Sequence, residues 1–213
     1  PVLEKQAAQA EAARCLLCNE MCSLCVTVCP NRANQAYSSA PLEIEVPTFV
    51  LSENCLQRRD SIPFGVRQKT QIVNLADLCN ECGNCRTFCP TAGAPYKDKP
   101  RLTLDRRIYD ETPSAIVYIT TEPDTKQADT SVAEQWTLRA KLEPFEHILQ
   151  RKADTLRYQS PAVKATLTLK DWQVKEAAPG PEAQSGKVID LMSAAKLYVF
   201  AQGVVDSLPF LFD

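Results

Sequence analysis

The chain has 213 residues, enough for one or two domains, and a formal net charge of −2 at neutral pH. This near-neutral charge gives no electrostatic basis for binding nucleic acid or an anionic membrane. Ten cysteines are far more than a domain of this size usually carries. No signal peptide is recognisable, so we expect cysteines that bind metal in the cytoplasm rather than disulfides. Because the chain begins with Pro1 and not Met, we also expect a piece of a longer polypeptide.

The first 14 residues are rich in Ala, Gln and Glu, and their apolar residues recur roughly at helical spacing. They predict a short helix that leads into a cysteine-rich stretch, although the weak apolar face fits a solvated connector equally well. The stretch that follows contains five cysteines and ends in a Cys-Pro pair: Cys15, Cys18, Cys22, Cys25 and Cys29.

Residues 40–75 separate this stretch from a second one and are longer than a simple two-loop protein needs, so we interpret them as an insertion. Leu42 to Val46 alternate apolar and polar residues and predict a strand that Pro47 ends, with residues 49–51 as a candidate continuation. Residues 71–75 predict the strand that enters the second stretch. Cys55 stands alone and is expected to be a small core residue.

The second stretch has cysteines spaced by two, two and three residues, followed directly by Pro90: Cys79, Cys82, Cys85 and Cys89. This spacing is the signature of bacterial ferredoxins, in which three thiolates hold one iron–sulfur cluster and the fourth ligates the other cluster. Gly83 lets the loop backbone approach the inorganic sulfur. The signature therefore requires a second, matching loop.

Residues 17–30 supply that loop, since they repeat residues 78–90 with Met21 inserted. The duplication predicts two [4Fe–4S] clusters with crossed ligands. One is expected on Cys18, Cys22, Cys25 and Cys89, and the other on Cys79, Cys82, Cys85 and Cys29. Cys15 is left over and is favoured as a buried thiol that binds no iron, with ligand duty as the alternative because Cys15 and Cys18 form a good ligand pair.

Two other chemistries use cysteines at similar spacings. Zinc also takes Cys-x-x-Cys pairs, which would make the chain a structural or interaction module. Zinc does not require the third cysteine or the Cys-Pro that follows it. A third option, an iron–sulfur enzyme with an open iron site, needs a missing ligand, whereas this chain has spare ones. Tyr37 and Tyr96 follow the two Cys-Pro pairs and could shield the clusters from water or simply pack in the core.

Residues 105–176 contain no cysteine and alternate apolar and polar residues in several runs, which predicts a small antiparallel β region. The apolar phase slips near Lys170, which indicates a bulge or turn. Trp136 and Trp172 are expected to anchor its core. His147 is the only histidine and is expected on the surface or in a loop.

Residues 177–187 have the Pro- and Gly-rich composition of a linker. Residues 188–208 predict a helix with a broad apolar face. We interpret residues 188–213 as a C-terminal segment that docks against another domain or chain. Charged residues interrupt this helix, so no membrane span is expected. The expected fold is α+β: a two-cluster ferredoxin-like domain at 1–104, a β-rich region at 105–176, the linker and the C-terminal docking helix.

Four segments also carry a family resemblance: residues 11–18, 25–34, 78–90 and 94–99. Here the chain resembles the C-terminal iron–sulfur region of YgfK-type selenate reductase subunits. These are flavoprotein–iron–sulfur oxidoreductases related to the glutamate synthase small subunit and dihydropyrimidine dehydrogenase. The resemblance covers residues 11 to about 104. In the wider group the first cysteine pair supplies ligands, which raises the chance that Cys15 binds iron.

The resemblance implies an electron-transfer module of a larger oxidoreductase. NAD(P)H and FAD or FMN are expected on an upstream or partner flavoprotein domain, and a molybdenum-type reductase or hydroxylase is a candidate partner. Nothing in the chain predicts a dinucleotide site, because no glycine-rich phosphate loop follows a strand. We therefore expect no catalytic residue and no substrate site in this chain.

Overall fold

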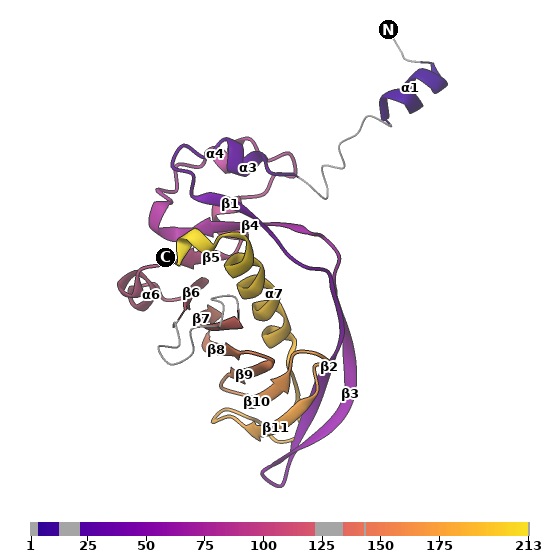
Figure 1. The fold of residues 1–213 in the computed structure, drawn as a ribbon, viewed down its shortest axis with the longest axis vertical. Helices are drawn as coiled ribbons and strands as arrows, with labels where there is room; N and C mark the ends of the chain where they lie inside the picture. Colours follow the sequence, from indigo (N-terminus) through magenta and orange to yellow (C-terminus); the bar gives the residue numbers. More distant parts are fainter. Residues whose placement is uncertain (1–3, 13–21, 122–133, 143, 213) are drawn as a thin grey trace.

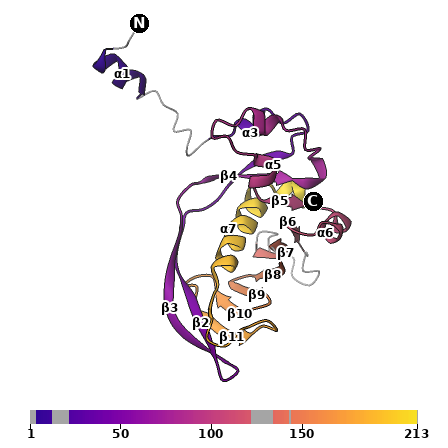
Figure 2. The ribbon, with the colours of Figure 1, turned by 180° about the vertical axis from the view of Figure 1, so that it is seen from behind.

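This computed structural model describes residues 4–12, 22–121, 134–142 and 144–212. Within them the chain forms one nine-stranded sheet, one three-stranded sheet and a long C-terminal helix (Figures 1 and 2). The large sheet has the order β1-β4-β5-β6-β7-β8-β9-β10-β11. Its strands are β1 Asn34–Ser38, β4 Thr70–Leu75, β5 Arg101–Thr103, β6 Ile116–Thr120, β7 Gln135–Leu142, β8 Phe145–Lys152, β9 Thr155–Gln159, β10 Val163–Thr168 and β11 Val174–Pro179.

The pairing of these strands changes along the sheet. β1 and β4 are antiparallel, β4, β5 and β6 run parallel, and each later pair from β6 to β11 is antiparallel. The sheet therefore runs from the cysteine-rich end into residues 105–176 across the expected boundary at residue 104. The smaller sheet has the order β12-β2-β3, with β2 Leu42–Ser52, β3 Cys55–Val66 and β12 Val188–Asp190.

The helices are mostly short, apart from the one near the C-terminus. They are α1 Lys5–Ala12, α3 Leu24–Thr27, α4 Asn84–Thr87, α5 Pro95–Asp98, α6 Arg106–Glu111 and α7 Met192–Ser207, with 3-10 turns η1 Ala76–Leu78 and η3 Pro209–Leu211. The short helix expected near the N-terminus is confirmed as α1. No helix among the described residues has both the length and the apolar character needed to cross a bilayer.

The alternation read from the sequence describes the middle of the sheet well. In β7 and β10, every second side chain is buried, as expected for strands with one face in the core. Trp136 and Trp172 are both buried, and both rings contact Tyr198 on α7. The two tryptophans are therefore confirmed as core anchors. The bulge or turn expected near Lys170 is confirmed as a turn at residues 169–171, between β10 and β11.

Helix α7 lies along the large sheet and carries much of the core. Its buried residues are Ala194, Ala195, Leu197, Phe200, Ala201, Gly203, Val204 and Val205. Figure 1 shows α7 between the sheet strands on one side and the long β2–β3 ribbon on the other. The docking helix expected for residues 188–208 thus packs within this chain. It begins later than expected, because residues 188–190 form β12 and pair with β2.

Three local expectations were wrong. Pro47 does not end a strand: β2 continues to Ser52, and the proline sits at a register shift against β3, where a missing N–H is tolerated. Cys55 is exposed at the start of β3, not buried in a core. The first residues of the expected linker, 177–179, belong to β11.

Candidate metal centre

The two cysteine loops share a local structure, which follows from their repeated sequence. Each contains a four-residue helix, α3 or α4, and the two helices pack against each other. At the start of α3 the N–H of Val26 donates to the carbonyl of Ser23 over 2.9 Å, and at the start of α4 the N–H of Arg86 donates to the carbonyl of Gly83 over 3.0 Å. Gly83 adopts φ +81°, a conformation that glycine reaches without strain.

The ends of the two loops also match. The backbone N–H of Ala33 donates to Cys29 Sγ over 3.2 Å, and the N–H of Gly93 donates to Cys89 Sγ over 3.3 Å. Three residues after each of these cysteines the backbone turns through positive φ, at Arg32 and Ala92. Each last cysteine is therefore held by the same backbone turn, with an amide directed at its sulfur.

Four cysteines of one predicted cluster line a common hollow: Cys29, Cys79, Cys82 and Cys85. Cys85 is buried and Cys82 is exposed, so the hollow lies at the surface. All eight described cysteines are free thiols. Four thiols around one space, with no histidine, are the donor set of a cubic iron–sulfur cluster, so the residues present fit that group.

No three His, Cys, Asp or Glu side chains within the described ranges are grouped so that they could hold one metal ion.

The other predicted ligand set is described only in part. Cys18 lies outside the described residues, as does its alternative Cys15. Of the remaining members, Cys25 is partly buried, and burial raises the pKa of its thiol while the charge of Lys99 opposes that shift. The pKa of the Cys89 thiol is lowered, chiefly by a hydrogen bond with Thr91 Oγ1 at 3.3 Å.

The two tyrosines expected near the clusters have different surroundings. Tyr96 lines the four-cysteine hollow, where its ring can limit access of water. Tyr37 lies in β1 and packs edge-to-face on Phe200 of α7, with ring centroids 5.9 Å apart. Tyr96 thus lies beside the four-cysteine hollow, whereas Tyr37 belongs to the core.

Two polar residues that sequence analysis did not identify support the loops. Asp77 in η1, just before Cys79, accepts hydrogen bonds from Thr103 Oγ1 at 2.7 Å and from the N–H of Leu104 at 3.0 Å. Asn34 is 1% exposed, lines the hollow and donates to the carbonyl of Cys25 over 3.0 Å. Their only sequence signal is a polar residue next to each cysteine loop.

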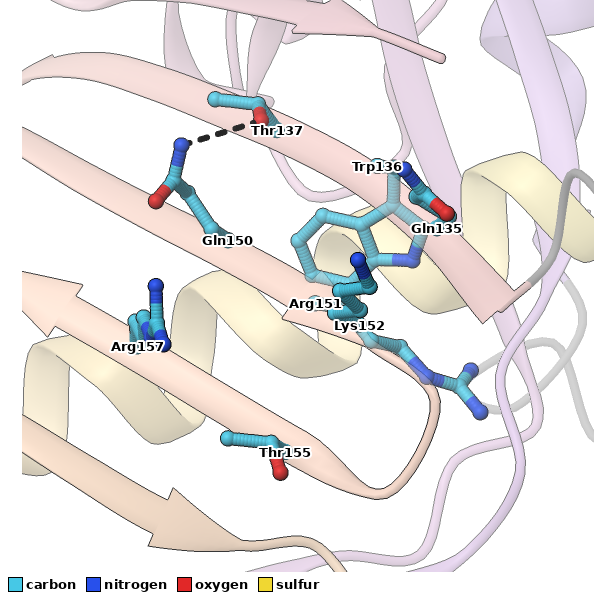
Figure 3. A pocket seen from close by; sticks show the side chains of 8 residues that line it. All are labelled: Gln135, Trp136, Thr137, Gln150, Arg151, Lys152, Thr155 and Arg157. Atoms are coloured by element: carbon cyan, nitrogen blue, oxygen red, sulfur yellow. Dashed lines mark hydrogen bonds between the residues drawn. The ribbon is translucent and has the colours of Figure 1, made fainter. Parts of the chain in front are cut away.

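Two further hollows lie away from the cysteines. His147, expected on the surface or in a loop, is instead a half-buried residue of β8, and its Nδ1 lies 2.6 Å from the hydroxyl of Tyr158. Both residues line a hollow with Ser193 at the start of α7. Figure 3 shows the other hollow, over β7, β8 and β9, where Gln150 donates to Thr137 and Arg157 lies nearby.

Comparison with known proteins finds relatives that match part of this chain. No family model matches the chain. No solved structure matches it. Two curated relatives, from Escherichia coli K12 and Escherichia coli O157:H7, both bear the name "Putative oxidoreductase YgfK". Each is 46% identical over 89 residues, a stretch that covers 42% of this chain and 6% of the relative. Over that stretch the chain is homologous to these YgfK proteins, most of whose length lies outside the match.

Proposed function

We propose that this chain is the electron-transfer module of a multidomain or multisubunit oxidoreductase and holds two [4Fe–4S] clusters. The observation that carries the proposal is the shared hollow of Cys29 with Cys79, Cys82 and Cys85. Cys29 comes from the first loop and the other three come from the second. This is the crossed arrangement that the duplicated signature requires. The homology to proteins named as oxidoreductases supports a redox role.

The residues of this chain have a limited task in such a module. The bound clusters supply one-electron transfer. The cysteines hold the clusters as thiolates, and the amides of Ala33 and Gly93 donate to the sulfurs of Cys29 and Cys89. Such hydrogen bonds stabilise negative charge on sulfur. Tyr96 covers part of one site and limits its access to water.

Electron donor and acceptor are proposed on other domains or subunits. A flavoprotein with FAD or FMN would take electrons from NAD(P)H and pass them to this module. A terminal reductase or dehydrogenase site, with a molybdenum-type partner as one candidate, would receive them. The reverse direction uses the same residues. Bond-making chemistry would then lie outside this chain, whose residues determine potential, insulation and docking.

The test is iron and acid-labile sulfide analysis of protein that has been purified without oxygen, with EPR of the dithionite-reduced form. We expect about eight iron and eight sulfide per chain, as for two cubes. Cys29→Ala should lose about half of both, because one cluster loses a ligand. Cys55→Ala is the matched control, since this exposed cysteine lies in the β2–β3 ribbon, and it should keep the full content.

Cys15→Ala separates the two assignments of the first cysteine pair. We expect the full iron content, whereas a loss of about half would make Cys15 a ligand. The zinc-binding structural module predicts a colourless protein with no sulfide. An iron-free but folded wild-type protein, after reconstitution with iron and sulfide under argon, would refute the electron-transfer proposal.

A further inference from the structure

A row of polar side chains crosses the strands that carry the two cysteine loops. Asn34 opens β1, and Asn74 lies directly opposite it in β4. Arg101 opens β5 and is the register partner of Asn74 on the other side of β4. Glu81 continues the row into the second cysteine loop, between Cys79 and Cys82. These four residues, Asn34, Asn74, Arg101 and Glu81, are called the polar row below.

The first half of the polar row is buried and hydrogen-bonded. Asn34 donates through Nδ2 to the carbonyl of Cys25 over 3.0 Å, and its Oδ1 accepts from Asn74 Nδ2 over 2.9 Å. Both asparagines are almost completely buried. The backbone of the first loop is therefore tied to β4, the strand that leads into the second loop.

The second half is an ion pair that reaches the hollow. Arg101 Nη2 lies 3.5 Å from Glu81 Oε1, and three quarters of the arginine side chain is covered. Glu81 lines the four-cysteine hollow and adopts φ +55°, a conformation unusual for a residue with a side chain. The ion pair gives this loop residue a fixed partner on β5.

Two buried atoms of the polar row have no hydrogen-bond partner among the described residues: Asn74 Oδ1 and Arg101 Nε. One is an acceptor and the other is a donor, and they belong to register partners on adjacent strands. Buried polar atoms without partners are rare because desolvation is costly, and they call for a reason beyond packing. Arg101 is thus kept largely buried beside the cysteine loop although one of its donors is unsatisfied.

We propose that the polar row holds the two cysteine loops in register and that Arg101 raises the reduction potential of the cluster on Cys29, Cys79, Cys82 and Cys85. This inference rests on the proposed function. Reduction adds an electron to a site already surrounded by four thiolates, so a nearby positive charge favours the reduced form. Glu81 lies in the second cysteine loop, and its negative charge lowers the same reduction potential. Both are positioning residues, since neither is a ligand.

The experiment measures the midpoint potentials of both clusters by EPR-monitored titration of the full chain, reconstituted without oxygen. Arg101→Gln should lower one of the two potentials by about 59 mV, a tenfold change in a one-electron equilibrium. Glu81→Gln should raise the same potential. Arg101→Lys keeps the charge and should stay closer to the wild type than Arg101→Gln does.

Arg157→Gln is the matched control. Arg157 is an exposed arginine of β9 (Figure 3). β9 is four strands from β5 in the sheet, which corresponds to about 19 Å at the usual strand spacing. It should leave both potentials unchanged. Shifts of the same sign in Arg101→Gln and Glu81→Gln, or equal shifts of both clusters, would indicate general loosening of the fold and overturn the inference.

The outcome for the wild type separates this inference from the function on which it depends. A wild type that binds no iron–sulfur cluster refutes the electron-transfer proposal itself. A wild type with two clusters whose potentials are the same in Arg101→Gln refutes only the role of the polar row. Failure of Arg101→Gln to bind one cluster, with normal loading of Arg101→Lys, supports the row as the element that holds the loops together.

Discussion

At the residue scale, the single histidine has a partly buried environment that affects its protonation. His147 lies in β8, its Nδ1 is 2.6 Å from the hydroxyl of Tyr158, and the two rings lie 5.9 Å apart. Burial lowers the pKa of His147 and raises the pKa of Tyr158 to about 12. The folded chain therefore favours a neutral imidazole beside a neutral phenol. Since the sequence has one histidine, no second imidazole titrates in the same range.

This lowered pKa predicts how stability depends on pH. The unfolded chain binds a proton on His147 at a pKa of about 6.5, and the folded chain binds it only at lower pH. The stabilisation is complete above that value and is lost as pH falls through the folded pKa. The slope is at most about 1.4 kcal/mol per pH unit, reduced by solvent at the half-exposed ring. Urea unfolding at pH 7.5, 6.5 and 5.5 measures this pH dependence of the free energy of unfolding.

His147→Gln is the comparison, because glutamine can still hydrogen-bond to Tyr158 but does not titrate. Its free energy of unfolding should change less than that of the wild type between pH 7.5 and 5.5. Parallel pH profiles for the two proteins would contradict the prediction and assign the acid sensitivity to the carboxylates.

At the residue scale, the sequence is most informative where the chemistry of ligand binding fixes the spacing of the cysteines. Cys29, Cys79, Cys82 and Cys85 line one hollow, and their role as ligands of one cluster stays a prediction. Asn34 and Asp77 could not be found in this way, because their roles depend on partners brought close by folding. The exposed position of Cys55 could not be predicted for a related reason: a single cysteine in a sequence carries no information about burial.

At the scale of elements, the contact between α7 and β1 sets how closely helix and sheet approach. Ser207 Oγ donates to the carbonyl of Ser38 over 3.0 Å and accepts from its N–H over 2.8 Å. Gly203 faces the same strand, and a Cβ there would lie 2.8 Å from the ring of Tyr37 and 2.9 Å from the carbonyl oxygen of Ser38. Glycine is needed at this position because the backbones approach closely.

Gly203→Ala should therefore destabilise the protein, although alanine favours a helix by up to about 1 kcal/mol over glycine. The clash involves backbone, which cannot move aside easily, so we expect a net loss of about 1–3 kcal/mol in the free energy of unfolding. Lys196→Ala, at an exposed position of the same helix, should stay within about 0.5 kcal/mol. Equal or higher stability of Gly203→Ala, by chemical unfolding, would show that α7 and β1 can separate without cost.

Elements are predictable where one face is buried. Period-two patterns identified β7 and β10 correctly because their other face is polar. The same logic ends β2 too early, because a proline usually stops a strand, whereas Pro47 lies at a register shift that tolerates it. The sequence predicts too early a start for α7, because Val188 and Ile189 of β12 are apolar and periodicity cannot distinguish so short a strand from helix.

At the scale of the whole molecule, α7 connects the parts that the sequence suggested were separate. Its C-terminal half contacts β1, the strand after the first cysteine loop, through Phe200 and Ser207, and Tyr198 near its middle contacts Trp136 of β7. A single cluster of buried residues extends from Tyr37 to Leu208. Strand alternation could not reveal this arrangement, because it shows that a face is buried but not what covers it. The β2–β3 ribbon then flanks α7 on its other side (Figure 2).

This connection predicts that the C-terminal segment is required for folding of the cysteine-rich end. A chain truncated after residue 187 loses β12 and α7 and exposes the core faces of β1 and β7. We expect it to lose cooperative unfolding and to bind less iron and sulfide, although every cysteine remains. Phe210→Ala tests the last turn alone, and because that ring is 61% exposed its removal should change little. If the truncated chain kept both a cooperative urea transition and full cluster content, residues 22–121 would not depend on α7, and the helix would be an attachment rather than part of the core.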